Sequence, residues 1–193
     1  MTRRLRIAAT IPWLLVLVRL LLAPLIIVIS HRASDRTILL LYLLGFATDY
    51  FDGVIARRLK TDTPLLRKSD GAVDTVFHLA LAFITIQRHP EEFRKSLLAL
   101  TIFIVSAATW YILDAIRWRR LAGFHSYSAK LFSIGLLVWM IALYGGHATG
   151  RILSVVLLVG VYANIEGILI SLLLKQDRPD VPTFVRAIRK PAE

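Results

Sequence analysis

The stretch Thr37–Arg58, "TILLLYLLGFATDYFDGVIARR", decides the fold class of this chain. It begins as an apolar run typical of a membrane-spanning helix, and it ends with two aspartates and two arginines. A second apolar stretch, "DGAVDTVFHLALAFITI" at Asp70–Ile86, opens with two further aspartates. The chain therefore places four carboxylates beside two segments that are otherwise suited to the interior of a lipid bilayer.

The overall composition indicates an integral membrane protein. Of the 193 residues, 56% are hydrophobic, and the mean hydropathy of +0.64 lies well above the range of soluble domains. A net charge of +11 would suggest nucleic-acid binding in a soluble protein. Here the basic residues lie between and beside apolar runs, so we expect anionic membrane lipids or phosphorylated ligands as partners, and no nucleic acid. The chain has no cysteine, which excludes disulfides and thiol chemistry.

Six apolar segments are long enough to span a membrane, which takes about 20 residues per helix. They cover residues 9–30, 37–58, 64–87, 96–117, 129–146 and 152–174. The segments between them are short and polar, so the sequence predicts an all-α bundle of six transmembrane helices in one domain spanning residues 1–193. The basic N-terminal residues 2–10 lack a following cleavage site, and we expect them to form an amphipathic helix on the membrane surface.

The distribution of Lys and Arg predicts the orientation. Most basic residues fall on one side if the N-terminus lies in the cytoplasm, as the positive-inside rule requires. We therefore expect a multi-pass protein of the cell membrane, with both termini and the site facing the cytoplasm. In this topology the second helix runs toward the cytoplasm and the third returns from it, so Asp49, Asp52, Asp70 and Asp74 share the cytoplasmic half.

The spacing of the four aspartates predicts a divalent-cation site. On a helix with 100° per residue, Asp49 and Asp52 lie about 60° apart, and Asp70 and Asp74 about 40° apart. One charged residue in the bilayer centre costs about 2.5–3.5 kcal/mol, and four carboxylates also repel one another. Hard cations such as Mg²⁺ or Mn²⁺ relieve both costs, and four carboxylates offer enough oxygens for two ions. Gly53 shares the face of Asp49 and leaves room for a ligand.

These residues resemble the CDP-alcohol phosphotransferase family, whose pattern is D-x₂-D-G-x₂-A-R-x₈-G-x₃-D-x₃-D. The chain reads Asp49-x₂-Asp52-Gly53-x₂-Ala56-Arg57, then eight residues, Leu66, three residues, Asp70, three residues and Asp74. Every spacing fits, and all positions but the second glycine match. The six-helix plan extends the resemblance over the whole chain.

The resemblance implies a reaction and a set of roles. Such enzymes transfer a phosphatidyl-type group from a CDP-linked lipid, such as CDP-diacylglycerol, to an alcohol in phospholipid biosynthesis, and they release CMP. The implied metal ligands are Asp49, Asp52, Asp70 and Asp74, with Asp74 also the catalytic general base. The implied contacts to the CDP-lipid are Asp49, Asp52, Gly53, Ala56, Arg57 and Thr63. The resemblance also implies a homodimer, and it leaves the acceptor alcohol open.

Two regions depart from the family pattern on the side that would face the nucleotide. Leu66 stands where the family has its second glycine. The first helix often reads P-N-x₂-T-x₂-R in relatives, whereas this chain has Trp13 and Val16 in place of Asn and Thr. Pro12 and Arg19 fit. These changes leave the metal-binding half of the pattern intact and alter the nucleotide-facing half.

Several other polar residues allow two interpretations each. Arg19 lies mid-helix and either joins the polar site, through a carboxylate or a phosphate, or forms a structural pair with Asp114 or Glu166. Glu166 either orients an acceptor or pairs with a cation, and we favour the structural role. We expect His78, one turn after Asp74, to be a hydrogen-bonded packing residue. The candidates for acceptor contacts are Lys130, Arg117 and Arg120.

Two other functions compete with a transferase. A divalent-cation transporter would also place carboxylates within the membrane, although its path should continue through the outer half, which lacks acidic residues. A catalytically inactive relative that binds the nucleotide lipid is the second alternative, because of Leu66, Trp13 and Val16.

Overall fold

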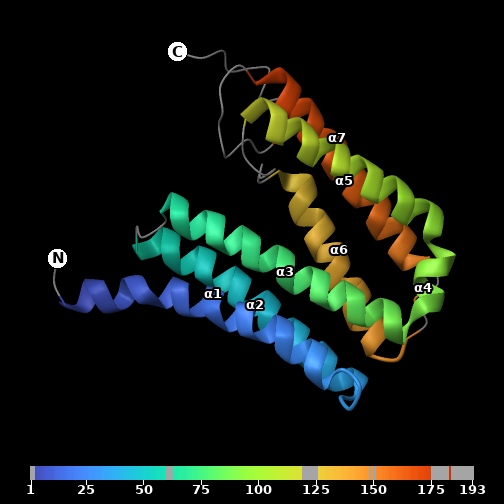
Figure 1. Cartoon of the computed structure of the whole chain (residues 1–193), viewed down its shortest axis with the longest axis horizontal. Coiled ribbons are helices and arrows are strands. Elements are labelled where there is room, and N and C mark those ends of the chain that lie inside the picture. The colour runs from blue at the N-terminus through green and yellow to red at the C-terminus, as the bar shows by residue number, and fades with distance from the viewer. Residues whose placement is uncertain are drawn as a thin grey trace. The chain divides into compact units, whose positions relative to one another are not determined.

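The computed structural model describes residues 3–59, 63–118, 126–147, 149, 151–174 and 183, with only the backbone described for residues 3–9 and for positions 57, 64, 67 and 68. Within these ranges the fold is all-α, as predicted (Figure 1). Among the described residues, six helices are long and apolar enough to cross a membrane. The helices are α1 (Arg3–Ile29), α2 (Asp35–Leu59), α3 (Pro64–Arg88), α4 (Pro90–Lys95), α5 (Leu97–Trp118), α6 (Tyr127–Tyr144) and α7 (Ile152–Leu173).

The predicted helices agree with the observed ones to within a few residues at most ends. At the N-terminus, residues 3–9 form the first turns of α1 itself, in one continuous helix with the candidate membrane span that starts at Thr10. The short helix α4 was not predicted. It has Pro90 at its first position and Glu91 and Glu92 in its first turn, which is a favourable start for a helix. The chain folds into two compact units, Met1–Pro90 and Glu91–Glu193, which are described separately below.

In the first unit, α1 packs along both α2 and α3. Figure 1 shows the three helices side by side. The most buried apolar side chains of the first unit include Ile26, Ile38, Phe77 and Ile84, all at most 1% exposed. A β-carbon added to Gly45 of α2 would lie 2.2 Å from Cζ of Phe77 on α3. The absence of a side chain at Gly45 therefore allows the Phe77 ring to approach the α2 backbone closely.

Arg88, in the last turn of α3, fixes that end of the helix against the turn between α1 and α2. Its guanidinium donates hydrogen bonds to the carbonyl oxygens of Ser30, at 3.2 Å, and Ala33, at 3.0 and 3.1 Å. It also forms an ion pair of 2.8 Å with Asp35. These contacts attach the end of α3 opposite to Pro64 to the turn between α1 and α2.

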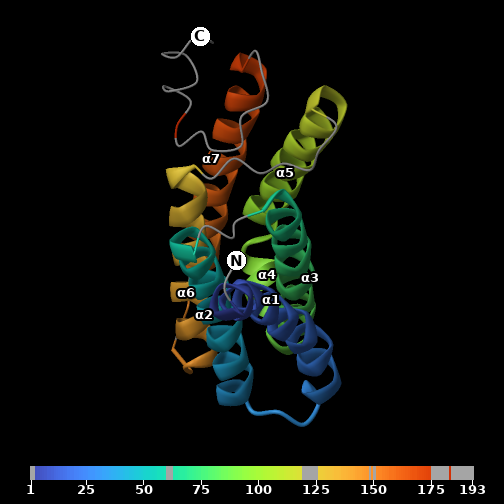
Figure 2. The same ribbon diagram turned by 90° about the vertical axis from the view of Figure 1, so that its left-hand side faces the viewer.

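In the second unit, α7 packs against both α5 and α6. Figure 2 shows α6 and α7 alongside one another. A β-carbon at Gly160 of α7 would lie within 3 Å of the rings of Phe103 and Phe132, and one at Gly167 would lie 2.4 Å from the ring of Trp110. Two glycines seven residues apart thus line one face of α7 and let aromatic rings reach its backbone.

Hydroxyl and amide groups satisfy much of the polar interior of this second unit. Ser154 donates to Ser96 at 2.9 Å, and the side-chain amide of Asn164 donates to Ser106 at 2.9 Å. Thr149 donates a hydrogen bond to Glu92, which also pairs with Lys95 at 3.1 Å. These buried polar groups of the second unit thus have partners from their own unit, as the low dielectric of a membrane interior favours.

Candidate active site

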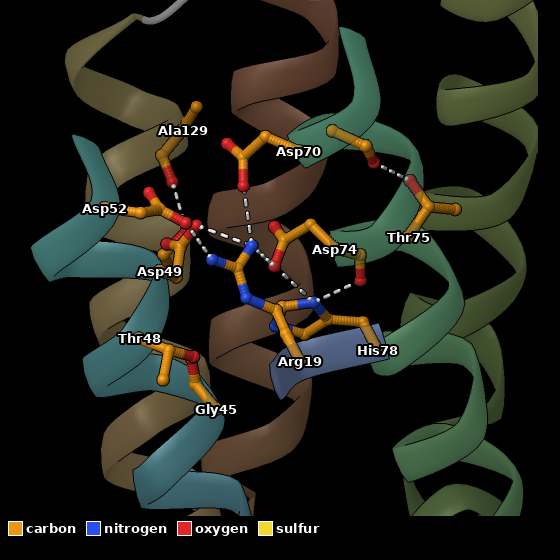
Figure 3. A network of polar contacts seen from close by, with 12 residues as sticks. Arg19, Gly45, Thr48, Asp49, Asp52, Asp70, Asp74, Thr75, His78 and Ala129 are labelled. Atoms are coloured by element: carbon orange, nitrogen blue, oxygen red, sulfur yellow. Dashed lines mark hydrogen bonds and ion pairs between the residues drawn. The ribbon is translucent and has the colours of Figure 1, made fainter. Parts of the chain in front are cut away.

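The four aspartates of the sequence pattern meet on neighbouring helices of the first unit (Figure 3). Asp49 and Asp52 lie in the second half of α2, and Asp70 and Asp74 lie in the first half of α3. The start of α3 is set by Thr63, whose hydroxyl accepts a hydrogen bond of 3.2 Å from the backbone NH of Leu66. This N-cap and the proline that follows it begin the helix at residue 64, where the predicted apolar segment 64–87 starts, before the two aspartates of α3.

Three of the aspartates have the geometry of a metal-ligand set. Asp49, Asp52 and Asp70 each offer a carboxylate oxygen, and these oxygens lie within 4.8 Å of one another. Hard carboxylate oxygens at this spacing suit Mg²⁺ or Mn²⁺, so the residues fit the metals that the sequence pattern implies. The Asp52 side chain is almost fully buried, whereas those of Asp49, Asp70 and Asp74 are 43%, 32% and 33% exposed. The cluster is therefore open to a ligand on the side of these three residues.

Arg19 of α1 lies at the centre of the cluster. Its Nη1 is 3.1 Å from Asp49 Oδ1, 2.9 Å from Asp70 Oδ1 and 3.2 Å from Asp74 Oδ1. Its Nη2 forms an ion pair with Asp52, and the arginine side chain is 0% exposed. Of the two interpretations of Arg19, the structure supports the first, in which it joins the polar site through carboxylates. Its mid-helix position indicated that it needs a partner, but the sequence did not indicate that it contacts all four aspartates.

His78 lies beside Asp74 on α3 and has a local hydrogen bond. Its Nδ1 is 2.8 Å from the backbone carbonyl oxygen of Asp74 and 3.6 Å from the carboxylate of the same residue. The imidazole therefore has the hydrogen bond that we expected, but its side chain is 43% exposed and not packed in the interior, and it lies near one of the four carboxylates.

The residues expected to contact the donor lie near the ends of α2 and α3. Gly53 is half-buried, Ala56 is buried and Thr63 is exposed. The position of Arg57 is known for its backbone only, so its side chain lies outside the described atoms.

The two departures from the family pattern meet in one apolar cluster. Val16 of α1, Ala56 of α2 and Leu66 of α3 are each 5% exposed and pack together, with Val73 against them. Trp13, the other altered residue of the first helix, is 42% exposed. Leu66 thus contributes to the packing of three helices where the family has glycine, and it belongs to the same apolar cluster as Ala56, which the resemblance assigns to the donor pocket.

The residues considered for the acceptor belong to the second unit. The Lys130 ammonium lies 5.5 Å from the centre of the Tyr127 ring. Arg117 donates a hydrogen bond of 3.0 Å to the carbonyl oxygen of Leu174 and lies over the ring of Trp118. Arg120 falls outside the described residues. Arg117 therefore has a structural role at the end of α7, whether or not it also contacts a ligand.

Glu166 has a partner within the second unit. Its carboxylate accepts a short hydrogen bond from Ser128, whose hydroxyl is also 2.8 Å from that of Ser126, the N-cap of α6. This arrangement ties α7 to the start of α6, which supports a structural role, although through a serine hydroxyl where we expected a cation.

Comparison with known proteins identifies the class of the whole transmembrane region. A family model described as CDP-alcohol phosphatidyltransferase matches residues 9–173, a range that contains all six membrane-spanning segments. No curated protein and no solved structure gives a significant match. The family match favours a transferase over the divalent-cation transporter, since the aspartates lie within the matched range.

Proposed function

Since the chain belongs to the CDP-alcohol phosphatidyltransferase family, we propose that it transfers a phosphatidyl-type group from a CDP-linked lipid, such as CDP-diacylglycerol, to an alcohol and releases CMP. The observation that carries this proposal is the convergence of four carboxylates from α2 and α3 beside one partly open face. The product would be a phospholipid or its precursor, and the reaction would belong to phospholipid biosynthesis.

The metal ligands in this proposal are Asp49, Asp52, Asp70 and Asp74, which would hold two Mg²⁺ or Mn²⁺ ions. The spacing of the first three supports the assignment. The ions would supply positive charge that offsets the charge of the donor phosphates. The carboxylates would orient the ions, and the partial exposure of Asp49, Asp70 and Asp74 leaves oxygens accessible from that side.

Asp74 is our candidate for the general base. Its carboxylate would take the proton of the acceptor hydroxyl as the acceptor oxygen forms a bond to phosphorus. The bond between that phosphorus and the CMP oxygen would break, and CMP would leave with the electron pair. This direct displacement needs no covalent intermediate, in keeping with a chain that has no cysteine to act as a nucleophile.

The donor would lie against Gly53, Ala56, Arg57 and Thr63, with the guanidinium of Arg57 on its phosphates. Lys130, Arg117 and Arg120 remain the candidates for contacts with a phosphorylated acceptor. We further propose that the protein acts as a homodimer in the cell membrane, with the aspartates in the cytoplasmic leaflet.

The activity is tested with the purified full-length chain in lipid nanodiscs. Labelled CDP-diacylglycerol and Mg²⁺ or Mn²⁺ would be combined with a panel of acceptors: glycerol phosphate, inositol phosphate, serine and choline-type alcohols. We expect metal-dependent release of CMP with at least one of them and none in EDTA. No release with any acceptor would overturn the proposal. Metal-dependent binding of CDP without release would instead support the inactive relative that binds the nucleotide lipid.

The orientation can be tested separately, because a chain without cysteine gives no background in thiol labelling. Single cysteines would be placed at Ser34, in the turn between α1 and α2, and at Arg58, at the end of α2. We expect a membrane-impermeant maleimide to label intact cells only at Ser34→Cys. Labelling of intact cells only at Arg58→Cys would show the opposite orientation.

A further inference from the structure

Arg19 carries one positive charge among four carboxylates and cannot satisfy them all. Its Nη1 has two hydrogens, yet three carboxylate oxygens lie 2.9–3.2 Å from it. Its Nη2 contacts Asp52, and its Nε has no hydrogen-bond partner among the described residues. The formal charge of the five side chains is therefore strongly negative, and the cluster retains a strong attraction for further positive charge.

The carboxylates that contact Arg19 are the ones that offer a metal-ligand set. Asp49, Asp52 and Asp70 form that set, and each of them is paired with the Arg19 guanidinium. A carboxylate oxygen that binds a hard cation gives up much of its capacity to accept a hydrogen bond from arginine. Two cationic groups that approach the same oxygens also repel each other.

We propose that Arg19 competes with divalent cations for the four aspartates and thereby sets the cation affinity of the site. This inference rests on the metal-dependent function proposed above and adds a role for Arg19, which lies outside the pattern of aspartates. Cation binding weakens the pairing of Arg19 with the carboxylates. When the cations leave, Arg19 pairs with the carboxylates again and holds α2 and α3 together.

The geometry explains why the competition depends on this side chain. Arg19 comes from α1, which packs along both α2 and α3, so its fork reaches carboxylates of both helices at once. A lysine at this position keeps the charge but has a single nitrogen, and it cannot reproduce the separate contacts of Nη1 and Nη2. An uncharged residue of similar length removes the competition altogether.

The test measures cation binding directly, with no substrate present. Mn²⁺ would be titrated into the purified full-length protein, and free Mn²⁺ would be followed by electron paramagnetic resonance. The samples are the wild type, Arg19→Met, Arg19→Lys and the matched control Arg88→Met, which removes another ion-paired arginine of the same unit. We expect Arg19→Met to bind Mn²⁺ at least ~10-fold more tightly than the wild type, because a unit charge next to the carboxylates is removed.

The remaining samples separate competition from a structural role. Arg19→Lys should bind Mn²⁺ roughly threefold more tightly than the wild type, since it loses one of the two nitrogens of the fork. The Mn²⁺ affinity of Arg88→Met should equal that of the wild type. In EDTA, Arg19→Met should unfold at a lower temperature than the wild type. Saturating Mn²⁺ should raise the unfolding temperature of Arg19→Met by more than it raises that of the wild type. If Arg19→Met does not fold, the Mn²⁺ affinity of Arg19→Lys decides the question.

The competition would be overturned if the wild type binds Mn²⁺ and the folded Arg19 variants bind it no more tightly. That result would leave the metal site of the proposed function intact. Absence of Mn²⁺ binding in every variant and in the wild type would overturn both. Binding by Arg19→Met alone would support the competition in its strongest form, in which the arginine blocks the site.

Discussion

The two units bury polar groups in opposite ways. The first unit concentrates charge, with one buried guanidinium among four carboxylates from two helices. In the second unit, hydroxyl and amide groups bond one another or single carboxylates, as between Ser128 and Glu166 or Asn164 and Ser106. Neutral hydrogen bonds are enough to join helices within a membrane. A cluster with excess negative charge is costly, and it is expected where a cation or a proton transfer is needed.

The largest expected effect is on catalysis in the first unit. Asp74→Asn keeps the size of the side chain and removes its basicity, so CMP release should fall by about 10³-fold, within the range of general-base catalysis. Asp35→Asn is the matched control, because Asp35 lies in the same unit and pairs with Arg88. Its rate should stay close to the wild type. Equal losses in both variants, measured on folded protein, would mean that Asp74 acts through stability and not through chemistry.

The next effect concerns the apolar cluster of Val16, Ala56 and Leu66. Leu66→Ala should lower the free energy of unfolding by about 2–3 kcal/mol, because it leaves a cavity between three helices. It should also lower the KM for the CDP-lipid, since Leu66 fills space in the cluster that contains Ala56, a residue of the proposed donor site. A matched control is Leu153→Ala in the second unit, where Leu153 is 2% exposed. That variant should lose comparable stability and leave the KM unchanged. An unchanged KM in Leu66→Ala would show that Leu66 serves packing alone.

A smaller effect is expected from alanine substitutions of one glycine in each unit, which distinguish a loss of helix packing from a change in the geometry of the aspartates. Gly45→Ala and Gly167→Ala each bring a methyl group into an aromatic ring, at 2.2 Å from Phe77 and 2.4 Å from Trp110. Both should lose about 1–3 kcal/mol of stability, the usual cost of overpacking. Only Gly45→Ala should also weaken Mn²⁺ binding, because the shift moves α2 against α3 and separates their aspartates. Weaker Mn²⁺ binding in Gly167→Ala would break the distinction between the two units.

The smallest effect is expected at Glu166. Glu166→Gln retains an oxygen that accepts the Ser128 hydroxyl but replaces a charged acceptor with a neutral one, so it should cost only about 1 kcal/mol, the difference between the two kinds of hydrogen bond. CMP release should remain within roughly threefold of the wild type if the second unit uses its carboxylate for structure. The rate would be measured at saturating donor. A loss as large as that of Asp74→Asn would place Glu166 in the reaction and end the contrast between the units.

Local pattern predicted the helices well and the contacts between them poorly. The start of α3 at Thr63 was readable because an N-cap acts on residues within one turn. The helix α4 was missed, because a proline and four charged residues in a six-residue segment between two apolar runs look like a loop. The partner of Arg19 was left between two alternatives, since pairing across helices depends on the packing of α1 and not on its sequence.

The same distinction between local pattern and contacts across helices holds for the candidate site. The spacing of the four aspartates was sufficient to propose metal ligands, because residues three or four apart share a helix face in any fold. The packing of Leu66 against Val16 and Ala56 was not predictable. Each substitution viewed alone reads as a loss from the nucleotide-facing pattern, and only together do they form an apolar contact.

The sequence by itself determined that this protein is a membrane bundle of six spanning helices, with its carboxylates gathered on two of them and with a family pattern around them. Those properties follow from hydropathy, helix periodicity and residue spacing, which act over a few turns of one segment. The tertiary structure decided that a single arginine of α1 meets all four aspartates and that Leu66 packs in one cluster with Val16 and Ala56. Such contacts depend on how three helices pack in space, because side chains from distant segments become neighbours only when the helices take their final register.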